Sequence, residues 1–242
     1  MLDLGTLERL VPDRVAGGEA TGHETLQLHL ERYRFAARHV RGGRLLDMAC
    51  GVGFGTRLVA DACPALDEAI GVDVDPEAVR YARDRYGRAG VGFVEADALR
   101  YDDAEGFDAV VSLETIEHVA DPHALARRLV ERVRPGGLLI ASVPITPSVD
   151  WNPHHRNDFT ERSFRGLFAG ADLREVEALR QVQKVPVLAL LRGRERRLAD
   201  RRPQLVRWYL GHPGAVLRRV GATFRYGFTN RYLTVAWRTP TR

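Results

Sequence analysis

The feature that most constrains the fold of this chain is the alternation of short apolar segments with helical patterns over its first two thirds. Apolar runs predict buried strands at residues 44–49, 69–72, 91–95, 107–113 and 138–143. Asp-Pro pairs at 75–76 and 121–122 predict capped helix starts between these strands. Strands that alternate with helices form a parallel sheet with both faces covered, so the sequence predicts a doubly wound α/β domain.

Acidic residues stand at or just after the ends of four predicted strands, where ligands of doubly wound domains bind. They are Asp47, Asp73, Asp97 and Glu114. A glycine-rich turn at residues 51–55 opens the first helix of this region and allows the backbone to approach a ligand closely. A dinucleotide fingerprint counted from Gly51 would need glycine where Thr56 stands, and the chain has no Gly-Lys-Ser/Thr loop. The pattern therefore disfavours nicotinamide, flavin and P-loop nucleotide sites.

The glycine turn and the three aspartates, in this order and spacing, resemble the class I S-adenosylmethionine-dependent methyltransferases over about residues 45–143. The resemblance implies a seven-stranded, mainly parallel Rossmann-like sheet and S-adenosylmethionine as the cofactor, with Asp73 on the ribose hydroxyls and Asp97 near the adenine amino group. The family usually has glycine where this chain has Ala49. The implied cofactor-binding residues are Asp47, Ala49, Gly51, Gly53, Asp73, Val74, Asp97, Ala98, Leu113 and Tyr33. The alternative is that the aspartates only cap turns and the glycines only open a helix.

Apolar residues at helical spacing between Leu26 and Val40 predict an N-terminal helix that ends before the glycines at 42–43. This helix resembles the cap that the family places over its cofactor. Arg32, Tyr33 and Arg34 are the candidates for contact with the cofactor carboxylate, while the apolar stripe is expected to belong to the core.

The segment after the fourth predicted strand, SLETIEHV, bears on the acceptor class. It lacks the Asn/Asp-Pro-Pro-Phe/Tyr signature of enzymes that methylate planar amides or nucleobase amines. With the RPGG turn and NPHHRNDFT, it resembles ubiquinone-biosynthesis O-methyltransferases and related envelope-glycan and natural-product enzymes. The resemblance implies methyl transfer to a hydroxyl of a small molecule: a sugar, a glycan precursor or a natural product, phosphorylated or not. An N-methyltransferase acting on an amino sugar and a non-catalytic cofactor-binding sensor or scaffold remain alternatives.

Glu114, Glu117 and His118 have the spacing i, i+3, i+4, which brings them to one face if the chain turns helical after the fourth strand. Together with His155 they are candidate ligands for a divalent cation such as Mg²⁺. The ExxEH pattern also resembles metal-dependent small-RNA 2′-O-methyltransferases. In the competing interpretation His118 is a metal-free general base steadied by Glu117 or Glu114, and His118, His155 and Glu117 are the catalytic candidates. In a third, the acids favour a helix start and His118 is a packed turn residue.

The last third of the chain predicts an insertion. Residues 174–180 and 231–237 are the expected sixth and seventh strands, which form an antiparallel pair in the family. The expected organisation is a helical cap at 1–41, a core at 42–180 and 231–242, and a lid at 181–230 within the same domain. The lid carries an arginine cluster: Arg192, Arg194, Arg196, Arg197, Arg201 and Arg202. We expect it to hold an anionic acceptor; a solvated helix or transient membrane docking are the alternatives.

Charge and hydropathy bound the partners. The net charge is only +4, but residues 174–219 hold twelve basic and four acidic residues, which favours a local anionic contact over general nucleic-acid binding. The chain contains no apolar run of the roughly 20 residues that a membrane helix needs, and its first residues lack a signal-peptide core. We therefore expect a cytoplasmic protein without stable membrane insertion; the sequence indicates no oligomeric state.

Overall fold

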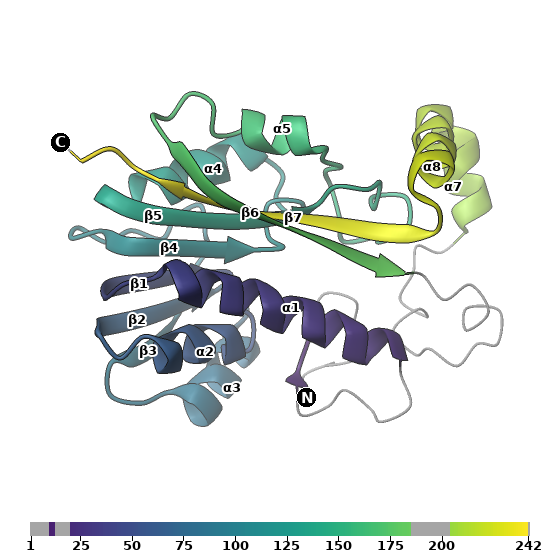
Figure 1. The fold of residues 1–242 in the computed structure, drawn as a ribbon. Coiled ribbons are helices and arrows are strands. Elements are labelled where there is room, and N and C mark those ends of the chain that lie inside the picture. Colours follow the sequence, from purple (N-terminus) through teal and green to yellow (C-terminus); the bar gives the residue numbers. More distant parts are fainter. Residues whose placement is uncertain (1–9, 13–19, 185–203, 242) are drawn as a thin grey trace.

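The computed structural model describes residues 10–12, 20–184 and 204–241, and within them the chain forms one seven-stranded sheet with helices on both faces (Figure 1). The strands are β1 Gly43–Met48, β2 Leu66–Asp73, β3 Val91–Glu95, β4 Phe107–Leu113, β5 Val133–Pro144, β6 Arg174–Lys184 and β7 Thr229–Arg238. The helices are α1 Ala20–His39, α2 Phe54–Ala62, α3 Pro76–Tyr86, α4 Pro122–Glu131, α5 Glu161–Gly166, α7 Leu205–Gly211 and α8 Pro213–Tyr226.

The strand order is β3-β2-β1-β4-β5-β7-β6. The first five strands are parallel, whereas β7 runs antiparallel to both β5 and β6. From β1 the chain first builds outward through β2 and β3 and then returns to the other side through β4 and β5. The switch point between β1 and β4 is where a doubly wound sheet binds its ligand, at the carboxyl ends of the strands. The doubly wound fold and the antiparallel β6–β7 pair are thus confirmed.

Two apolar layers hold the helices to the sheet. Successive strand residues point to opposite faces, so Leu45 packs with α1, α2 and α3 whereas Leu46 packs with α4 and α5. Phe35 of α1 is fully buried in the first layer, and Phe164 of α5 is fully buried in the second. Figure 1 shows α1 lying across the face of the sheet. This packing places the N-terminal helix beside the carboxyl ends of the parallel strands.

Local capping chemistry sets the helix starts, as the sequence predicts. The Asp75 carboxylate accepts hydrogen bonds from two backbone N–H groups of α3, and the Asp121 carboxylate accepts one from Ala124 of α4. Thr160 forms a reciprocal capping box with Ser163 at the start of α5. Each side chain satisfies backbone donors that a helix start leaves unpaired.

The insertion differs from expectation at its ends. Strand β6 continues to Lys184 and β7 begins at Thr229, so residues at both expected ends of the lid belong to the sheet. Helices α7 and α8 precede β7 and stand at the carboxyl end of the parallel strands (Figure 1). The arginine cluster between Arg192 and Arg202 lies outside the described residues. No helix in the described part of the chain has both the length and the apolar composition needed to cross a bilayer.

Candidate active site

A cavity of about 1040 Å³ opens at the carboxyl ends of β1, β2 and β4, and α1, α7 and α8 contribute to its walls. Eight of the ten predicted cofactor residues line it: Tyr33, Ala49, Gly51, Asp73, Val74, Asp97, Ala98 and Leu113. The other two, Asp47 and Gly53, lie behind the lining. The predicted residues are therefore gathered around one space, although they come from separate strands and helices.

The turn after β1 is a left-handed backbone segment. Ala49, Gly51 and Gly53 have φ angles of 61°, 56° and 83°. A Cβ on Gly53 would lie 2.6 Å from the Phe93 ring, so only glycine fits there. A Cβ on Gly51 would meet nothing within 4 Å among the described residues, because Gly51 faces the cavity. The turn thus presents bare backbone to a bound molecule, and the methyl group of Ala49 is accommodated.

Asp73 ends β2 and is held in place by the backbone. Its carboxylate accepts hydrogen bonds from the N–H of Gly51 (2.8 Å) and the N–H of Asp75 (3.0 Å). Asp97, on the segment after β3, accepts a hydrogen bond from the N–H of Leu99 (2.8 Å). Each carboxylate retains acceptor capacity toward the cavity, which suits the hydroxyl and amino donors of a nucleoside.

Asp47 lies beneath the glycine turn instead of on the cavity wall. Its carboxylate accepts hydrogen bonds from the hydroxyl of Thr56 (2.6 Å) and the hydroxyl of Tyr33 (3.2 Å). Burial raises the pKa of Asp47 to about 7, although both hydrogen bonds act in the opposite direction. Tyr33 does line the cavity, so Asp47 acts on the site by fixing this ring.

The N-terminal helix reaches the site through Tyr33 alone among its three cationic or phenolic candidates. Arg32 is buried away from the cavity, where it donates to Gln181 (2.8 Å) and lies over the Tyr232 ring, and so joins α1 to β6 and β7. Arg34 is exposed and does not line the cavity. Gly55 makes the approach of Tyr33 possible, since a Cβ at Gly55 would lie 1.9 Å from the phenol ring.

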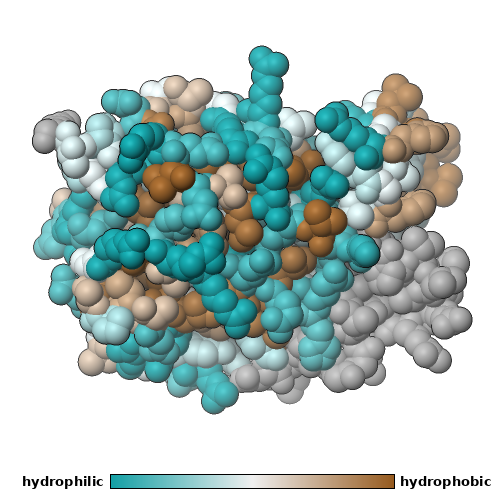
Figure 2. Space-filling model, viewed as in Figure 1, coloured by the Kyte–Doolittle hydropathy of each residue, from teal (hydrophilic) through white to brown (hydrophobic). Residues whose placement is uncertain are grey.

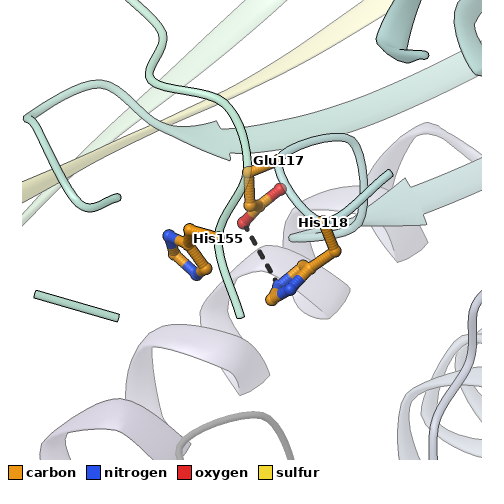
Figure 3. Close-up of side chains that lie close together, drawn as sticks. All are labelled: Glu117, His118 and His155. Carbon is orange, nitrogen blue, oxygen red and sulfur yellow. Dashed lines mark ion pairs between the residues drawn. The ribbon is translucent and has the colours of Figure 1, made fainter. Parts of the chain in front are cut away.

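The turn after β4 does not form the helix that would align its acids. Glu114 has φ 56°, and its carboxylate accepts a hydrogen bond from the Ser142 hydroxyl (2.7 Å). Glu117, His118 and His155 instead form a compact group whose ligand atoms lie within 4.8 Å of one another. Figure 3 shows the Glu117 carboxyl group close to both imidazole rings, and its Oε1 lies 4.0 Å from Nε2 of His118. Glu114 lines the cavity but lies outside this group.

The loop that carries His155 is bound to the turn after β4. The carbonyl oxygen of Glu117 accepts hydrogen bonds from the N–H groups of Arg156 (2.8 Å) and Asn157 (3.1 Å). The Asn157 side chain donates to the carbonyl of Val119 (2.8 Å). These contacts bring the His155 ring to 4.7 Å from the His118 ring, measured between centroids. His155 also pairs with the Ser148 hydroxyl at 2.7 Å, which fixes the orientation of its ring.

Glu117 is fully buried, and neither of its carboxyl oxygens has a hydrogen-bond partner among the described residues. Burial and then the charge of Glu114 raise the pKa of Glu117 to about 8. An unpartnered buried carboxyl group is costly to retain, so such groups concentrate at functional sites. Glu117 lines the cavity beside both histidines.

Two features of the site carry no local sequence signal. Tyr232 of β7 lines the cavity and donates its hydroxyl to Gln183 (3.0 Å), and burial raises its pKa. Asp150 is buried, pairs with Arg219 of α8 and accepts a hydrogen bond from Tyr209 of α7 (2.6 Å). Burial alone would favour protonated Asp150, but these two partners lower its pKa. Only the long-range fold brings these residues together.

Comparison with known proteins identifies the family. Residues 46–141 match the family model of a methyltransferase domain. A probable S-adenosylmethionine-dependent methyltransferase of Mycolicibacterium smegmatis is 29% identical over 189 residues, which make up 70% of this chain and 72% of that relative. These similarities support a class I S-adenosylmethionine-dependent methyltransferase. S-adenosylmethionine is therefore the cofactor of this methyltransferase.

Two further similar proteins differ in the atom that their names give as methylated, oxygen in one and nitrogen in the other. The ubiquinone biosynthesis O-methyltransferase of Azorhizobium caulinodans is 34% identical over 123 residues, which cover 49% of this chain and 47% of that protein. The methyltransferase thus spans about half the length of this curated relative. The N-methyltransferase NodS of Bradyrhizobium japonicum, in complex with S-adenosyl-L-homocysteine, matches the fold with a TM-score of 0.61 at 16% identity, covering 93% of this chain and 90% of that chain.

Proposed function

We propose that this class I methyltransferase transfers a methyl group to a hydroxyl of a small-molecule acceptor. The observation that carries the proposal is the position of His118 and His155, which line the same cavity as Asp73 and Asp97. The two rings meet edge-on in the wall of this cavity, with 4.7 Å between their centroids. A hydroxyl acceptor gains from a base at this position, whereas a neutral amine needs none.

The residues around the cavity fit the cofactor. In this proposal Asp73 accepts hydrogen bonds from the ribose hydroxyls and Asp97 accepts one from the adenine amino group. The backbone at Ala49 and Gly51 holds the methionine portion, while Val74, Ala98 and Leu113 provide apolar walls for the base. S-adenosylmethionine supplies a methyl group on a sulfonium, and the protein's main task is to align the acceptor with it.

His118 removes the proton from the acceptor hydroxyl. Burial and the charge of Glu114 raise the pKa of Glu117 to about 8, which favours its protonated form near neutral pH. A neutral imidazole can accept a proton from a hydroxyl group, and histidine is the side chain whose ordinary titration range lies near neutral pH. His155, oriented by Ser148, packs against His118 and limits its rotation. Glu117 and His155 are positioning groups in this mechanism.

The same three residues also fit a metal ion, and this is the competing mechanism. Glu117, His118 and His155 offer one carboxylate and two imidazole ligands, a set that suits transition metals such as Mn²⁺ or Zn²⁺. Mg²⁺ prefers oxygen ligands, and Glu114 is engaged by Ser142, so the expected four-residue Mg²⁺ site has weaker support. A cation held there would lower the pKa of the acceptor hydroxyl. Loss of turnover on chelation, restored by Mn²⁺, would favour this mechanism over the metal-free base.

We also propose that the acceptor carries an anionic group. Arg156, on the loop between β5 and α5, and Lys184, at the end of β6, both line the cavity. A phosphate, as in a nucleotide-linked sugar or a lipid phosphate, would pair with these cations. Arg219 lines the same wall, but its guanidinium is already bound to Asp150.

An amine acceptor is the second candidate. The carboxyl group of Glu114 lines the cavity and would attract an ammonium group before it loses its proton. NodS, which shares the fold, is described as an N-methyltransferase. An amino sugar is the acceptor class proposed here, because it carries an amino group on a small molecule.

Assays of hydroxyl and amino acceptors side by side separate the two candidates. We expect release of S-adenosylhomocysteine with hydroxyl compounds, phosphorylated ones above neutral ones, and little with the matching amines. Preference for the amine member of each pair would reverse the assignment. Cofactor binding without turnover on any acceptor would indicate a sensor or scaffold instead of an enzyme.

A further inference from the structure

Helix α8 has its polar and apolar sides inverted relative to an ordinary surface helix. The residues that face inward line the cavity or lie buried next to it, and they are small or polar: Ala215, Arg219, Ala222 and Thr223. The outward side carries Leu217, Val220 and Phe224, at positions i, i+3 and i+7. A surface helix normally buries such a stripe against its own core. In α8 the stripe faces solvent.

The exposed apolar surface extends from α8 to α7. Leu217 is 75% exposed and Phe224 is 89% exposed, while Val206 and Leu210 of α7 are 77% and 81% exposed. Figure 2 shows apolar side chains gathered on these helices at the upper right of the molecule. We call Val206, Leu210, Leu217, Val220 and Phe224 the outer face. A contiguous apolar face of this kind marks an interaction site.

The charges around the outer face indicate what binds it. Residues 204–228 contain four arginines and no acidic residue. Arg219 is turned inward to Asp150 and Arg218 pairs with Asp158 at 3.8 Å, whereas Arg207 and Arg225 are exposed beside the apolar stripe. A second copy of the chain would bring the same arginines together and be repelled. A surface that is both apolar and anionic satisfies the stripe and the cations at once.

We propose that the outer face of α7 and α8 docks on an anionic phospholipid bilayer. The arginines contact lipid headgroups, and Leu217, Phe224 and Leu210 enter the boundary between headgroups and acyl chains. Leu205, Tyr209 and Phe228, which adjoin the outer face, also line the cavity. Docking therefore turns one wall of the cavity toward the lipid surface. The interaction does not depend on the nature of the methyl acceptor.

Vesicle co-sedimentation of the full chain tests the proposal. We expect binding to phosphatidylcholine vesicles that contain phosphatidylglycerol, and binding about tenfold or more weaker to phosphatidylcholine alone or in high salt. The double variant Leu217→Ser/Phe224→Ser and the double variant Arg207→Glu/Arg225→Glu should each weaken binding by about tenfold or more. Val176→Ser, which removes an exposed valine of β6, is the matched control and should bind like the unsubstituted chain.

Two further measurements make the outcome decisive. Calorimetric titration with S-adenosylmethionine should give unchanged affinity for both double variants, which shows that they are folded. Equal binding to neutral and anionic vesicles, or no binding to either, would overturn the proposal. So would a dimer in size-exclusion chromatography that the Leu217→Ser/Phe224→Ser variant dissociates, because the outer face would then bind a second copy.

Discussion

Asp47 is enclosed beneath the glycine turn, with the hydroxyl groups of Thr56 and Tyr33 as its hydrogen-bond donors. Two neutral donors do not compensate for the loss of water around a carboxylate. The fold therefore favours the protonated acid, with a pKa of about 7. This residue couples the structure of the cofactor site to pH without contacting the cavity.

Asp47 makes stability fall as the pH rises. In the unfolded chain its carboxyl group ionises near pH 4, whereas in the folded chain it holds its proton until about pH 7. The free energy of unfolding should thus fall by roughly 4 kcal/mol between pH 4 and pH 7 on account of this residue and stay level above that range. Denaturant unfolding of the unsubstituted chain and of Asp47→Asn across this range measures the difference. Parallel pH profiles for the two proteins would contradict the prediction.

Asp73 should control cofactor affinity. Replacing it by alanine removes two hydrogen bonds between a charged acceptor and the ribose, each of about 1.5–3 kcal/mol, so affinity should fall by at least about 100-fold. Asp73→Asn, which keeps one acceptor for the N–H of Gly51, serves as a second variant that preserves the turn. Calorimetry with S-adenosylmethionine gives the result, and Asp84→Ala, an exposed acid of α3, is the control. Unchanged affinity in both Asp73 variants would exclude the proposed ribose contact.

Among the helices, the close contact between α1 and α2 should determine how well Tyr33 of α1 is held against the cofactor site. Gly55→Ala would place a methyl group against the Tyr33 ring and force the two helices apart. Overpacking of this kind costs about 1–3 kcal/mol, which lowers the melting temperature by roughly 3–10 °C and weakens cofactor binding. Gly166→Ala of α5, where nothing lies within 4 Å of the added methyl group among the described residues, should leave both unchanged. Equal melting temperatures for the two variants would refute the role of Gly55.

The elements that the sequence predicts well are those whose cause is local. Asp75 and Asp121 start helices because their own carboxylates cap the backbone that follows, so the pattern is visible in the sequence. The ends of β6 and β7 are harder to predict from the sequence, because each strand continues only through pairing with the other. The inverted sides of α8 could not be predicted either, since helical spacing identifies an apolar stripe but not what it faces.

The candidate site divides in the same way. Asp73 and Asp97 follow predictable strands, so the parallel sheet itself brings them to one edge. Glu114 adopts a left-handed backbone that breaks the expected helix, and only the structure reveals its contact with Ser142. Tyr232 lines the cavity from a strand more than 100 residues away from Glu117 in the sequence, and no local motif predicts this position. Long-range packing supplies what local patterns cannot.

In the molecule as a whole, an ion pair between buried Asp150 and half-buried Arg219 joins the two helices before β7 to the loop that follows β5. Asp150 lies on the loop between β5 and α5, and its partners Arg219 and Tyr209 belong to α8 and α7. Arg219 also donates to the carbonyl of Pro147 (2.6 Å). The same loop brings His155 next to Glu117 and His118. A single loop thus links the position of α7 and α8 at the cavity to the position of His155.

His118 is the group that we propose to activate the acceptor. Replacing it by alanine should reduce turnover by about 10²–10⁴-fold on the hydroxyl acceptor found in the side-by-side assays, while calorimetry shows cofactor affinity unchanged. His123→Ala, an exposed histidine of α4, is the matched control and should retain full activity. Repeating the assay on chelator-treated protein distinguishes the metal-free base from metal assistance.

The decisive measurement is the initial rate of S-adenosylhomocysteine release by the His118→Ala variant at saturating cofactor. We predict a rate at least about 100-fold below that of the unsubstituted enzyme, with cofactor binding intact. A fully active His118→Ala variant would contradict the mechanism, whether His118 acts as a base or as a metal ligand.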